Sequence, residues 1–294
     1  MNFLKYKSLY FIISVLLTTT SLVSLTLWKL KPAIDFTGGS LIEIQLEQSF
    51  DLSQIRPIIN QHADFPVASI QTSQNNRLII KTEPINQNQV TQLQQKLQQQ
   101  LNQTIVLNRF ETIGPKLGKE LLTKMLIAIT LTALFILAYI AWTFKNWQYG
   151  LSAIIAMLHD TLILLGSFSL LGHFYRVEVD SLFITAVLTT LSFSVHDTVV
   201  VFDRIRESKK QFPSHPFELL ANKALTETMS RSLNNSLTII FMLAALLILG
   251  GESLKWFVTA LLIGTITGTY SSPFVAVPIL AYFRKLSPSH HRSP

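Results

Sequence analysis

Six long apolar runs, with one extended polar segment after the first, dominate the hydrophobic pattern of this 294-residue chain. The runs are 19 to 28 residues long, which lets a helix that rises about 1.5 Å per residue cross the hydrocarbon core of a bilayer. The runs are Leu9–Trp28, Leu121–Trp142, Tyr149–Leu171, Ser181–Phe202, Ser232–Gly250 and Trp256–Phe283. The pattern predicts an α-helical polytopic membrane protein with six transmembrane helices.

The first run has a second interpretation, because Lys5 and Lys7 precede it as they would in a cleaved signal peptide. Its apolar stretch is longer than a usual signal core, however, and no A-x-A cleavage site follows. We therefore expect an uncleaved helix within residues 1–31. An extracytoplasmic domain over 32–118, helices two to six over 119–286 and a cytoplasmic tail over 287–294 complete the expected organisation.

The polar segment shows short hydrophobic periods instead of long runs. Alternating residues predict strands, and apolar positions at helical spacing predict two short helices. In chain order we expect a strand at 40–46, a helix at 51–62 opened by Asp51 or Ser53, a hairpin over 68–82 turning at Gln74-Asn75-Asn76, a helix at 86–101 and a strand at 104–113. The Gln- and Asn-rich stretch 86–103 could be a disordered linker, but its leucines repeat at helical spacing. The order βαββαβ predicts a small α+β domain of the ferredoxin-like, split βαβ type.

The net charge of +7 would suit nucleic acid, but its distribution points elsewhere. Residues 33–115 hold seven acidic and five basic side chains, so the positive excess lies at the ends of the apolar runs. The two short loops on one side hold only Arg176 and Lys255, which by the positive-inside rule places both termini in the cytoplasm. We expect no nucleic-acid partner. The absence of cysteine excludes disulfides and thiolate metal sites.

Ionisable residues inside the apolar runs are the first candidates for function, because a charge in hydrocarbon costs at least about 2.5–3.5 kcal/mol. The candidates are the pair His159 and Asp160 in the third run, the pair His196 and Asp197 in the fourth, and Arg231 at the start of the fifth. Asp197 lies near the end of the fourth run and Arg231 at the start of the fifth, so both are near the same membrane surface. The sequence therefore predicts that they lie at similar depth. The pair His159 and Asp160 could instead hydrogen-bond neighbouring helices and only hold the bundle together.

Each of the two helices that carry Asp197 and Arg231 also has a polar stripe at helical spacing. The stripes are Thr190, Ser194 and Asp197 on one helix, and Arg231, Asn234, Asn235 and Thr238 on the next. If the stripes face each other, they pair Asp197 with Arg231 and form a polar lining that admits water. The alternative is that Arg231 snorkels to the headgroups while the hydroxyls bond their own backbones.

The remaining motifs indicate structure more than chemistry. Thr37-Gly38-Gly39-Ser40 lacks the Gly-Lys-Ser/Thr ending of a phosphate loop and predicts a tight turn into the first strand. Gly264 and Gly268 form a G-x-x-x-G pattern that predicts close helix packing. There is no nucleophile elbow and no H-E-x-x-H pattern, so we expect no enzyme activity, no cofactor and no metal site.

Taken together, several segments make the chain resemble the SecF branch of the SecD/SecF family of protein-export membrane proteins. The segments are IDFTGG at 34–39, GPKLGKEL at 114–121, LHD at 158–160, DTVVVFDRIRE at 197–207, the Arg231-Ser232 region and GGESLKWFVTALLIGTITGTYSSPFVAVPIL at 250–280. The resemblance implies half of a transporter of the RND (resistance-nodulation-division) superfamily in the bacterial inner membrane. It also implies three partners: SecD, the Sec translocon channel and a translocating polypeptide.

The same resemblance implies a proton-driven role for particular residues. Asp197 and Arg231 match the residues that serve proton conduction in the family, and Asp160 matches its His-Asp pair. Three positions depart from the family pattern: Ala33 replaces a glycine, His196 replaces an asparagine, and residues 234–238 read NNSLT in place of a Thr/Ser-rich element. The departures leave the coupling ion, H⁺ or Na⁺, open. A subunit that organises the translocon without moving ions and an independent exporter are the alternative hypotheses.

Overall fold

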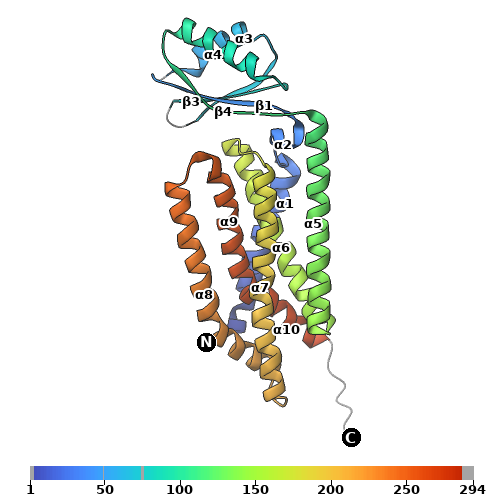
Figure 1. The fold of residues 1–294 in the computed structure, drawn as a ribbon. Helices are drawn as coiled ribbons and strands as arrows, with labels where there is room; N and C mark the ends of the chain where they lie inside the picture. Colours follow the sequence, from blue (N-terminus) through green and yellow to red (C-terminus); the bar gives the residue numbers. More distant parts are fainter. Residues whose placement is uncertain (1–2, 49, 74–75, 287–294) are drawn as a thin grey trace. The chain divides into compact units, whose positions relative to one another are not determined.

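The computed structural model describes residues 3–48, 50–73 and 76–286 (Figure 1). The chain divides into two compact units. One is Pro32–Leu126, and the other combines Met1–Lys31 with Ile127–Pro294. The predicted cytoplasmic tail at 287–294 and the first two residues of the predicted turn at 74–76 lie outside the described residues.

The larger unit is helical, and within the described residues it holds the six predicted membrane-spanning helices, except that residues 115–126 of α5 belong to the smaller unit. The helices are α1 (Lys7–Trp28, preceded by the 3₁₀ turn η1, Phe3–Tyr6), α5 (Pro115–Phe144), α6 (Trp147–Tyr175), α7 (Ser181–Gln211), α8 (Phe217–Leu249) and α9 (Glu252–Ser271), which continues through η2 (Ser272–Ala276) into α10 (Val277–Leu286). Most extend beyond the apolar runs, because a helix does not need to end where the lipid ends. The largest difference is at α8, which begins at Phe217 where the hydrophobic run begins at Ser232.

The sixth span is not a regular α-helix, which the sequence analysis did not predict. Residues Ser272–Ala276 form one π-helical turn between α9 and α10, with Pro273 near its start. Proline has no backbone N–H and disrupts the regular helical hydrogen-bond ladder, and single π turns are frequent at functional sites. The turn widens the helix where the buried Ser271 and Ser272 lie.

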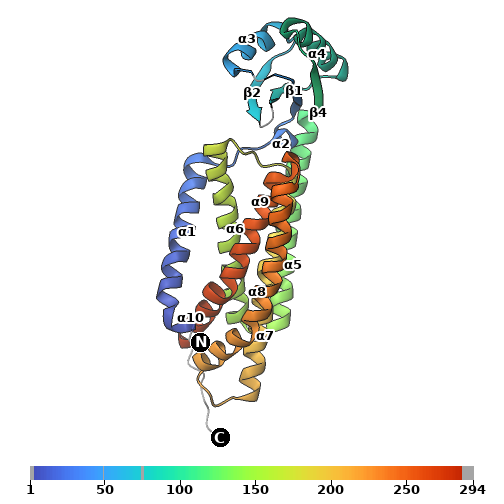
Figure 2. The ribbon, with the colours of Figure 1, turned by 90° about the vertical axis from the view of Figure 1, so that its left-hand side faces the viewer.

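Helices α6, α7 and α9 form the buried centre of this unit, and α1 packs against α6 on its outer side (Figure 2). Small residues bring these helices together. A Cβ on Gly166 would lie 2.2 Å from the Cβ of Ser21, and a Cβ on Gly264 would lie 2.2 Å from Oγ1 of Thr190. Gly268 lies against the backbone of Ser194, so the predicted close-packing face of Gly264 and Gly268 is confirmed. Helices α5 and α8 leave most of their apolar surface uncovered.

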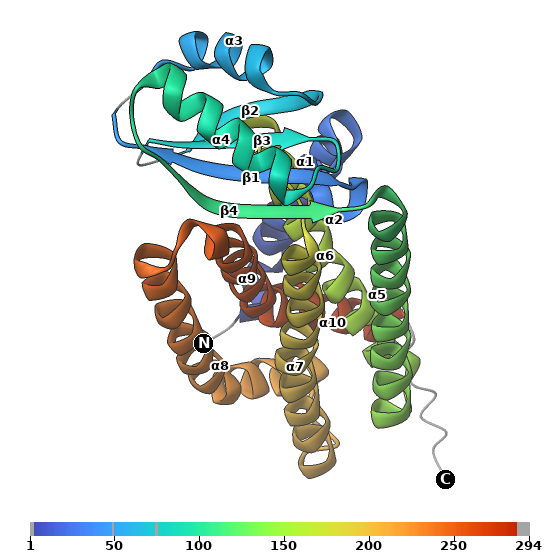
Figure 3. The ribbon, with the colours of Figure 1, turned by 45° about the horizontal axis from the view of Figure 1, so that its top comes forward.

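The smaller unit has the predicted element order βαββαβ. Its elements are β1 (Gly39–Leu46), α3 (Leu52–His62), β2 (Val67–Ser73), β3 (Arg77–Thr82), α4 (Gln87–Leu101) and β4 (Ile105–Ile113), preceded by the short helix α2 (Ile34–Thr37). The four strands form one antiparallel sheet of order β2-β3-β1-β4, and α3 and α4 cover the same face of it (Figure 3). A core of isoleucine, leucine and valine side chains fills the space between the sheet and the two helices.

Local sequence signals explain where these elements begin. The Asp51 carboxylate accepts the Ser53 N–H and caps α3, and Asn86 with Gln89 forms a capping box at α4, which is a helix and not a linker. Gly38 and Gly39 have φ of 75° and 126°, which favour glycine. They form the predicted turn into β1.

Candidate functional site

Asp160 lies on α6 at the centre of the helical unit and is 1% exposed. Its Oδ1 accepts a hydrogen bond from Nδ1 of His159 at 2.9 Å, and its Oδ2 accepts from the hydroxyls of Ser194 at 2.6 Å and Ser271 at 2.5 Å. The serines belong to α7 and α9, so one carboxylate ties three helices together. A carboxylate suits this position because it offers only acceptors.

His159 uses one ring nitrogen in this arrangement. Its ring packs near that of Tyr270, with centroids 6.4 Å apart, and the residue is 8% exposed. Within the described residues Nε2 is buried without a hydrogen-bond partner. A buried orphan nitrogen is unfavourable, so this ring atom has capacity for a proton or a water molecule.

A band of hydroxyls connects the surroundings of Asp160 to those of Asp197. Thr198, the residue after Asp197, is buried and lies 3.0 Å from the hydroxyl of Ser272. It also donates to the backbone of Ser194, which itself donates to Asp160. These hydroxyls surround Asp160, and Thr198 brings them within one residue of Asp197 along α7.

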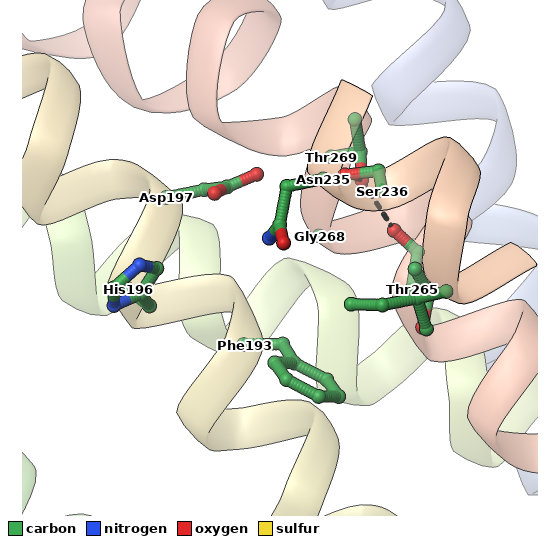
Figure 4. Close-up of a pocket in the computed structure, with 9 residues that line it drawn as sticks. Phe193, His196, Asp197, Asn235, Ser236, Thr265, Gly268 and Thr269 are labelled. Atoms are coloured by element: carbon green, nitrogen blue, oxygen red, sulfur yellow. Dashed lines mark hydrogen bonds between the residues drawn. The ribbon is translucent and has the colours of Figure 1, made fainter. Parts of the chain in front are cut away.

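Asp197 is half-buried on α7, and its Oδ2 accepts a hydrogen bond from the Ser232 hydroxyl of α8 at 2.7 Å. Beside it is a small cavity of about 20 Å³, which is room for about one water molecule. The lining residues come from α7, α8 and α9: Phe193, His196, Asp197, Asn235, Ser236, Ile239, Thr265, Gly268 and Thr269 (Figure 4). Asp197 and Asn235 point into the same space in this view.

The contribution of α9 to this site was missed from the sequence. Thr269 donates to the Ser236 hydroxyl at 2.6 Å, as Figure 4 shows, and Thr265 lies one turn before it on the cavity wall. The signal was present in the sixth apolar run, where Thr265, Thr269 and Ser272 follow Gly264 at helical spacing. Hydroxyls are common enough in membrane helices that spacing alone did not single them out.

Arg231 does not form the predicted ion pair with Asp197 among the described residues, so that expectation is wrong for this structure. It is exposed, and it lines a second, larger cavity of about 510 Å³ together with Arg204, Glu207 and Glu227. In that cavity Arg204 bridges α7 and α8 through Glu227 at 2.5 Å. The reason is rotational: adjacent residues of a helix point about 100° apart, and it is Ser232 that α8 turns toward Asp197.

The predicted polar stripes are also only partly correct. Thr190 bonds the Ala186 carbonyl of its own helix and packs on Gly264, and Thr238 is exposed and bonds its own helix through the Asn234 carbonyl. Asn235 lines the cavity of Asp197, whereas Asn234 is exposed. His196 is exposed apart from its contribution to the same cavity. Ser194 serves Asp160 rather than Asp197.

In the part of the chain that the structure describes, no group of three His, Cys, Asp or Glu side chains is arranged to hold a metal ion. The buried polar groups of this site are hydroxyls, two carboxylates and one imidazole. Carboxylates and an imidazole buried inside a membrane-spanning bundle are candidates for a functional site, because such groups are costly to place there.

Comparisons with known proteins agree with this picture. The model of the family described as "Protein export membrane protein SecD/SecF, C-terminal" matches residues 92–286, and that of the "SecD/SecF GG Motif" matches residues 29–49. The chain is 36% identical to protein translocase subunit SecF of Anaerolinea thermophila, over 95% of this chain and 93% of the relative. It is 38% identical to the subunit of the same name from Thermobaculum terrenum, over 95% and 92%.

A solved structure is similar as well. The crystal structure of SecDF, a translocon-associated membrane protein from Thermus thermophilus, superposes on 97% of this chain with a TM-score of 0.85 and 30% identity. This chain spans only 39% of that protein.

Proposed function

The chain belongs to the SecD/SecF family of protein-export membrane proteins, and from this membership we propose that it is a SecF-type subunit that uses the proton-motive force to assist protein translocation. The single observation that best supports ion coupling is Asp197. It is a half-buried carboxylate inside a membrane-spanning helix, hydrogen-bonded to a hydroxyl of the next helix and next to a cavity of one-water size.

Proton exchange at Asp197 changes how α7 and α8 pack. The ionised carboxylate accepts the Ser232 hydroxyl and attracts a cation, whereas the neutral acid needs neither, so each protonation state favours its own arrangement of the two helices. A membrane potential contributes about 2.3 kcal/mol per charge per 100 mV to a step that moves charge across the bilayer. One proton per cycle therefore biases the two arrangements appreciably.

Arg231 is the proposed counter-charge in the state that the structure does not display. Here its side chain lines the larger cavity beside Glu227, one residue from the Ser232 contact with Asp197. A rotation of α8 by about 100° would exchange Ser232 for Arg231 at Asp197. In this proposal the larger cavity, lined by charged side chains, is the aqueous route between Asp197 and the end of the bundle that the charge distribution assigns to the cytoplasm.

His159 and Asp160 supply the proposed second station of the relay. The hydroxyls around Asp160 include Ser194 on α7, one turn before Asp197, and Nε2 of His159 is buried without a partner among the described residues. His196, Asn235, Thr190 and Ser194 line or support this polar region. Asn234 and Thr238 lie outside it in this structure, so we assign them no direct role in the relay.

The proposed partners rest on the similarity to SecDF, of which this chain covers 39%. We propose that a SecD-related protein supplies the other half of an RND-type transporter. The translocon channel, the translocating polypeptide and the surrounding bilayer are the other proposed contacts, with both termini in the cytoplasm of a bacterial cell. The sheet order of the smaller unit supports a ferredoxin-like assignment for the domain that would contact the polypeptide.

One alternative has support of its own, namely a subunit that organises the complex without moving ions. The fully hydrogen-bonded carboxylate of Asp160 holds three helices together, as a purely structural group would. That alternative predicts that exchanging Asp197 for asparagine is silent, since the amide still accepts the Ser232 hydroxyl.

Preprotein translocation into inverted membrane vesicles tests the proposal. Asp197→Asn and Arg231→Met are expected to abolish the stimulation by proton-motive force while leaving the amount of complex unchanged. Glu218→Gln is the matched control, because this carboxylate lies on α8 but pairs with Lys7 and Lys285 at the end of the bundle. Full stimulation with Asp197→Asn would overturn the ion-coupled role and leave the structural one.

A further inference from the structure

A second cluster of charged and aromatic side chains lies far along α7 from Asp197, where α5 ends and α6 begins. Phe144 and Tyr149 stack with centroids 5.4 Å apart, and both rings also meet Phe202 of α7 edge-on. Two guanidinium groups cover this aromatic layer. Arg206 of α7 lies 5.6 Å from the Phe144 ring, and Arg284 of α10 lies 5.4 Å from the Tyr149 ring.

The cations of this cluster outnumber its acids. Arg206 pairs with Asp203 at 2.6 Å and donates to the Thr143 carbonyl at 2.9 Å. Lys209, three residues further along α7, is exposed and close enough to Arg284 for their charges to repel. In the described part of the chain neither Lys209 nor Arg284 has a carboxylate partner. Two positive charges are therefore held near each other without compensation.

Buried polar atoms at the same place also lack partners. Among the described residues, the buried side-chain atoms without a hydrogen bond include Nε of Arg284 and Oγ1 of Thr143. A guanidinium N–H withdrawn from water without an acceptor is costly, and such groups in native proteins usually meet a water, an ion or a ligand. An oxygen ligand suits both atoms, because the Arg284 Nε–H only donates and the Thr143 hydroxyl can donate as well as accept.

The residue next to Arg284 differs from it in having an acidic partner. Lys285, the residue after Arg284, pairs with Glu218 at 2.8 Å, and Lys7 reaches the same carboxylate at 3.5 Å. A lysine or arginine that only sets the orientation of a helix in the membrane needs neither an acidic partner nor an aromatic ring beneath it. Arg284, in contrast, is held between the Tyr149 and Phe217 rings in one orientation.

We propose that Arg206 and Arg284, seated on the Phe144 and Tyr149 rings, and the nearby Lys209 bind the phosphate of an anionic phospholipid headgroup. The chemistry fits a phosphodiester, because a guanidinium offers parallel N–H donors to phosphate oxygens and the rings fix its plane. The location fits a lipid rather than a soluble anion. The cluster lies at the ends of membrane-spanning helices, and basic pockets between such helices on the cytoplasmic side bind anionic headgroups. The exposed Trp147 and Tyr282 beside it suit the depth of the headgroups.

On α7, Arg206 follows Asp197 by nine residues, which is about 14 Å along a helix. The hydrogen bonds of Arg206 go to Asp203 and the Thr143 carbonyl, and not to Asp160 or Asp197. The lipid site and the proton relay are therefore separable. A bound headgroup would fix the ends of α5, α6, α7 and α10 relative to one another and, through Phe217, to the first turn of α8.

The test is the retention of lipid by the full-length chain, purified in mild detergent from membranes and transferred to nanodiscs of known composition. Native mass spectrometry compares phosphatidylglycerol with phosphatidylcholine, which share the phosphodiester but differ in net charge. We expect wild type to retain phosphatidylglycerol preferentially. Arg284→Gln is expected to lower that preference about fivefold, since each basic residue near an anionic surface contributes about a factor of five. Lys209→Gln is expected to act in the same direction.

The adjacent Lys285→Gln is the matched control, because it removes the same charge from the same helix but from a lysine that already pairs with Glu218. It should leave the lipid preference unchanged. Equal effects of Arg284→Gln and Lys285→Gln, or no preference in wild type, would overturn the site and reduce the cluster to diffuse surface charge. A thermal stabilisation of the delipidated protein by millimolar inorganic phosphate that equals the effect of phosphatidylglycerol would also overturn the lipid assignment. Equal melting temperatures of all variants in lipid-free detergent exclude misfolding as the cause.

Discussion

Replacing Gly166 with alanine tests how tightly α1 is held against α6, the helix that carries Asp160. The new Cβ would lie 2.2 Å from the Ser21 Cβ and 2.4 Å from its Cα, whereas ordinary contact begins at 3.4 Å. A backbone atom cannot rotate away, so α1 must retreat by about 1 Å. That shift also disturbs the hydrogen bond from the Ser24 hydroxyl to the Gly166 carbonyl and the one from Ser169 to the Ser24 carbonyl.

The magnitude follows from three effects. Overpacking costs about 1–3 kcal/mol, and each weakened interhelical hydrogen bond about 0.6 kcal/mol in a membrane protein. Alanine in a helix recovers up to about 1 kcal/mol relative to glycine. The free energy of unfolding should therefore fall by about 1–3 kcal/mol.

Gly150→Ala on the same helix is the matched control for this prediction. Its Cβ would meet nothing closer than Ile140 at 3.9 Å, so it should be neutral or slightly stabilising. Unfolding of the full chain in mixed detergent micelles, followed by circular dichroism, measures both variants. If Gly166→Ala proved as stable as Gly150→Ala, the described packing of α1 on α6 would be refuted.

Three further predictions concern single side chains. Asp160→Ala should lower the free energy of unfolding by about 3–5 kcal/mol in the same assay, because it leaves the buried Ser194 and Ser271 hydroxyls without their acceptor. If it destabilises the protein no more than the same substitution at an exposed aspartate, the described network is contradicted. Asn86→Ala removes the capping box with Gln89, at a typical cost of about 1 kcal/mol. Hydrogen exchange of the first amides of α4 should therefore accelerate about fivefold. Unchanged exchange would argue against the cap. The Ser53 N–H bond lowers the pKa of Asp51 below the usual aspartate value, so the cap contributes its stability above that usual value and loses it as pH falls through the lowered pKa. An NMR titration of the Asp51 carboxyl measures this pKa, and a value at or above that of a free aspartate would contradict the contact.

Much of the fold could be predicted because its signals are periodic and local. Runs of apolar residues marked all six spans, and strand alternation with helical spacing gave the βαββαβ order of the smaller unit. The π-helical turn at Ser272–Ala276 could not be predicted in this way. It depends on how Pro273 and the buried serines fit between α6 and α7, which is a property of packing and not of spacing.

The candidate site was predictable in its charges but not in its contacts. The cost of burying a charge singled out Asp160 and Asp197 from the sequence alone. Which residue meets Asp197 depends on the rotation of α8 about its axis, and the hydrophobic pattern fixes that rotation too loosely to choose between the adjacent Arg231 and Ser232. Ser194 was predicted to share a polar stripe with Asp197 facing α8, but it donates to Asp160 of α6, a contact that spacing along α7 does not reveal.

Proton flux through the reconstituted complex tests the central claim most directly. Proteoliposomes that contain this chain with its SecD-related partner and a trapped pH-sensitive dye would report proton entry when a potential is applied. The account predicts that Asp197→Asn lowers the flux to that of protein-free liposomes, while Glu218→Gln conducts like wild type. Equal flux in wild type and Asp197→Asn would contradict it.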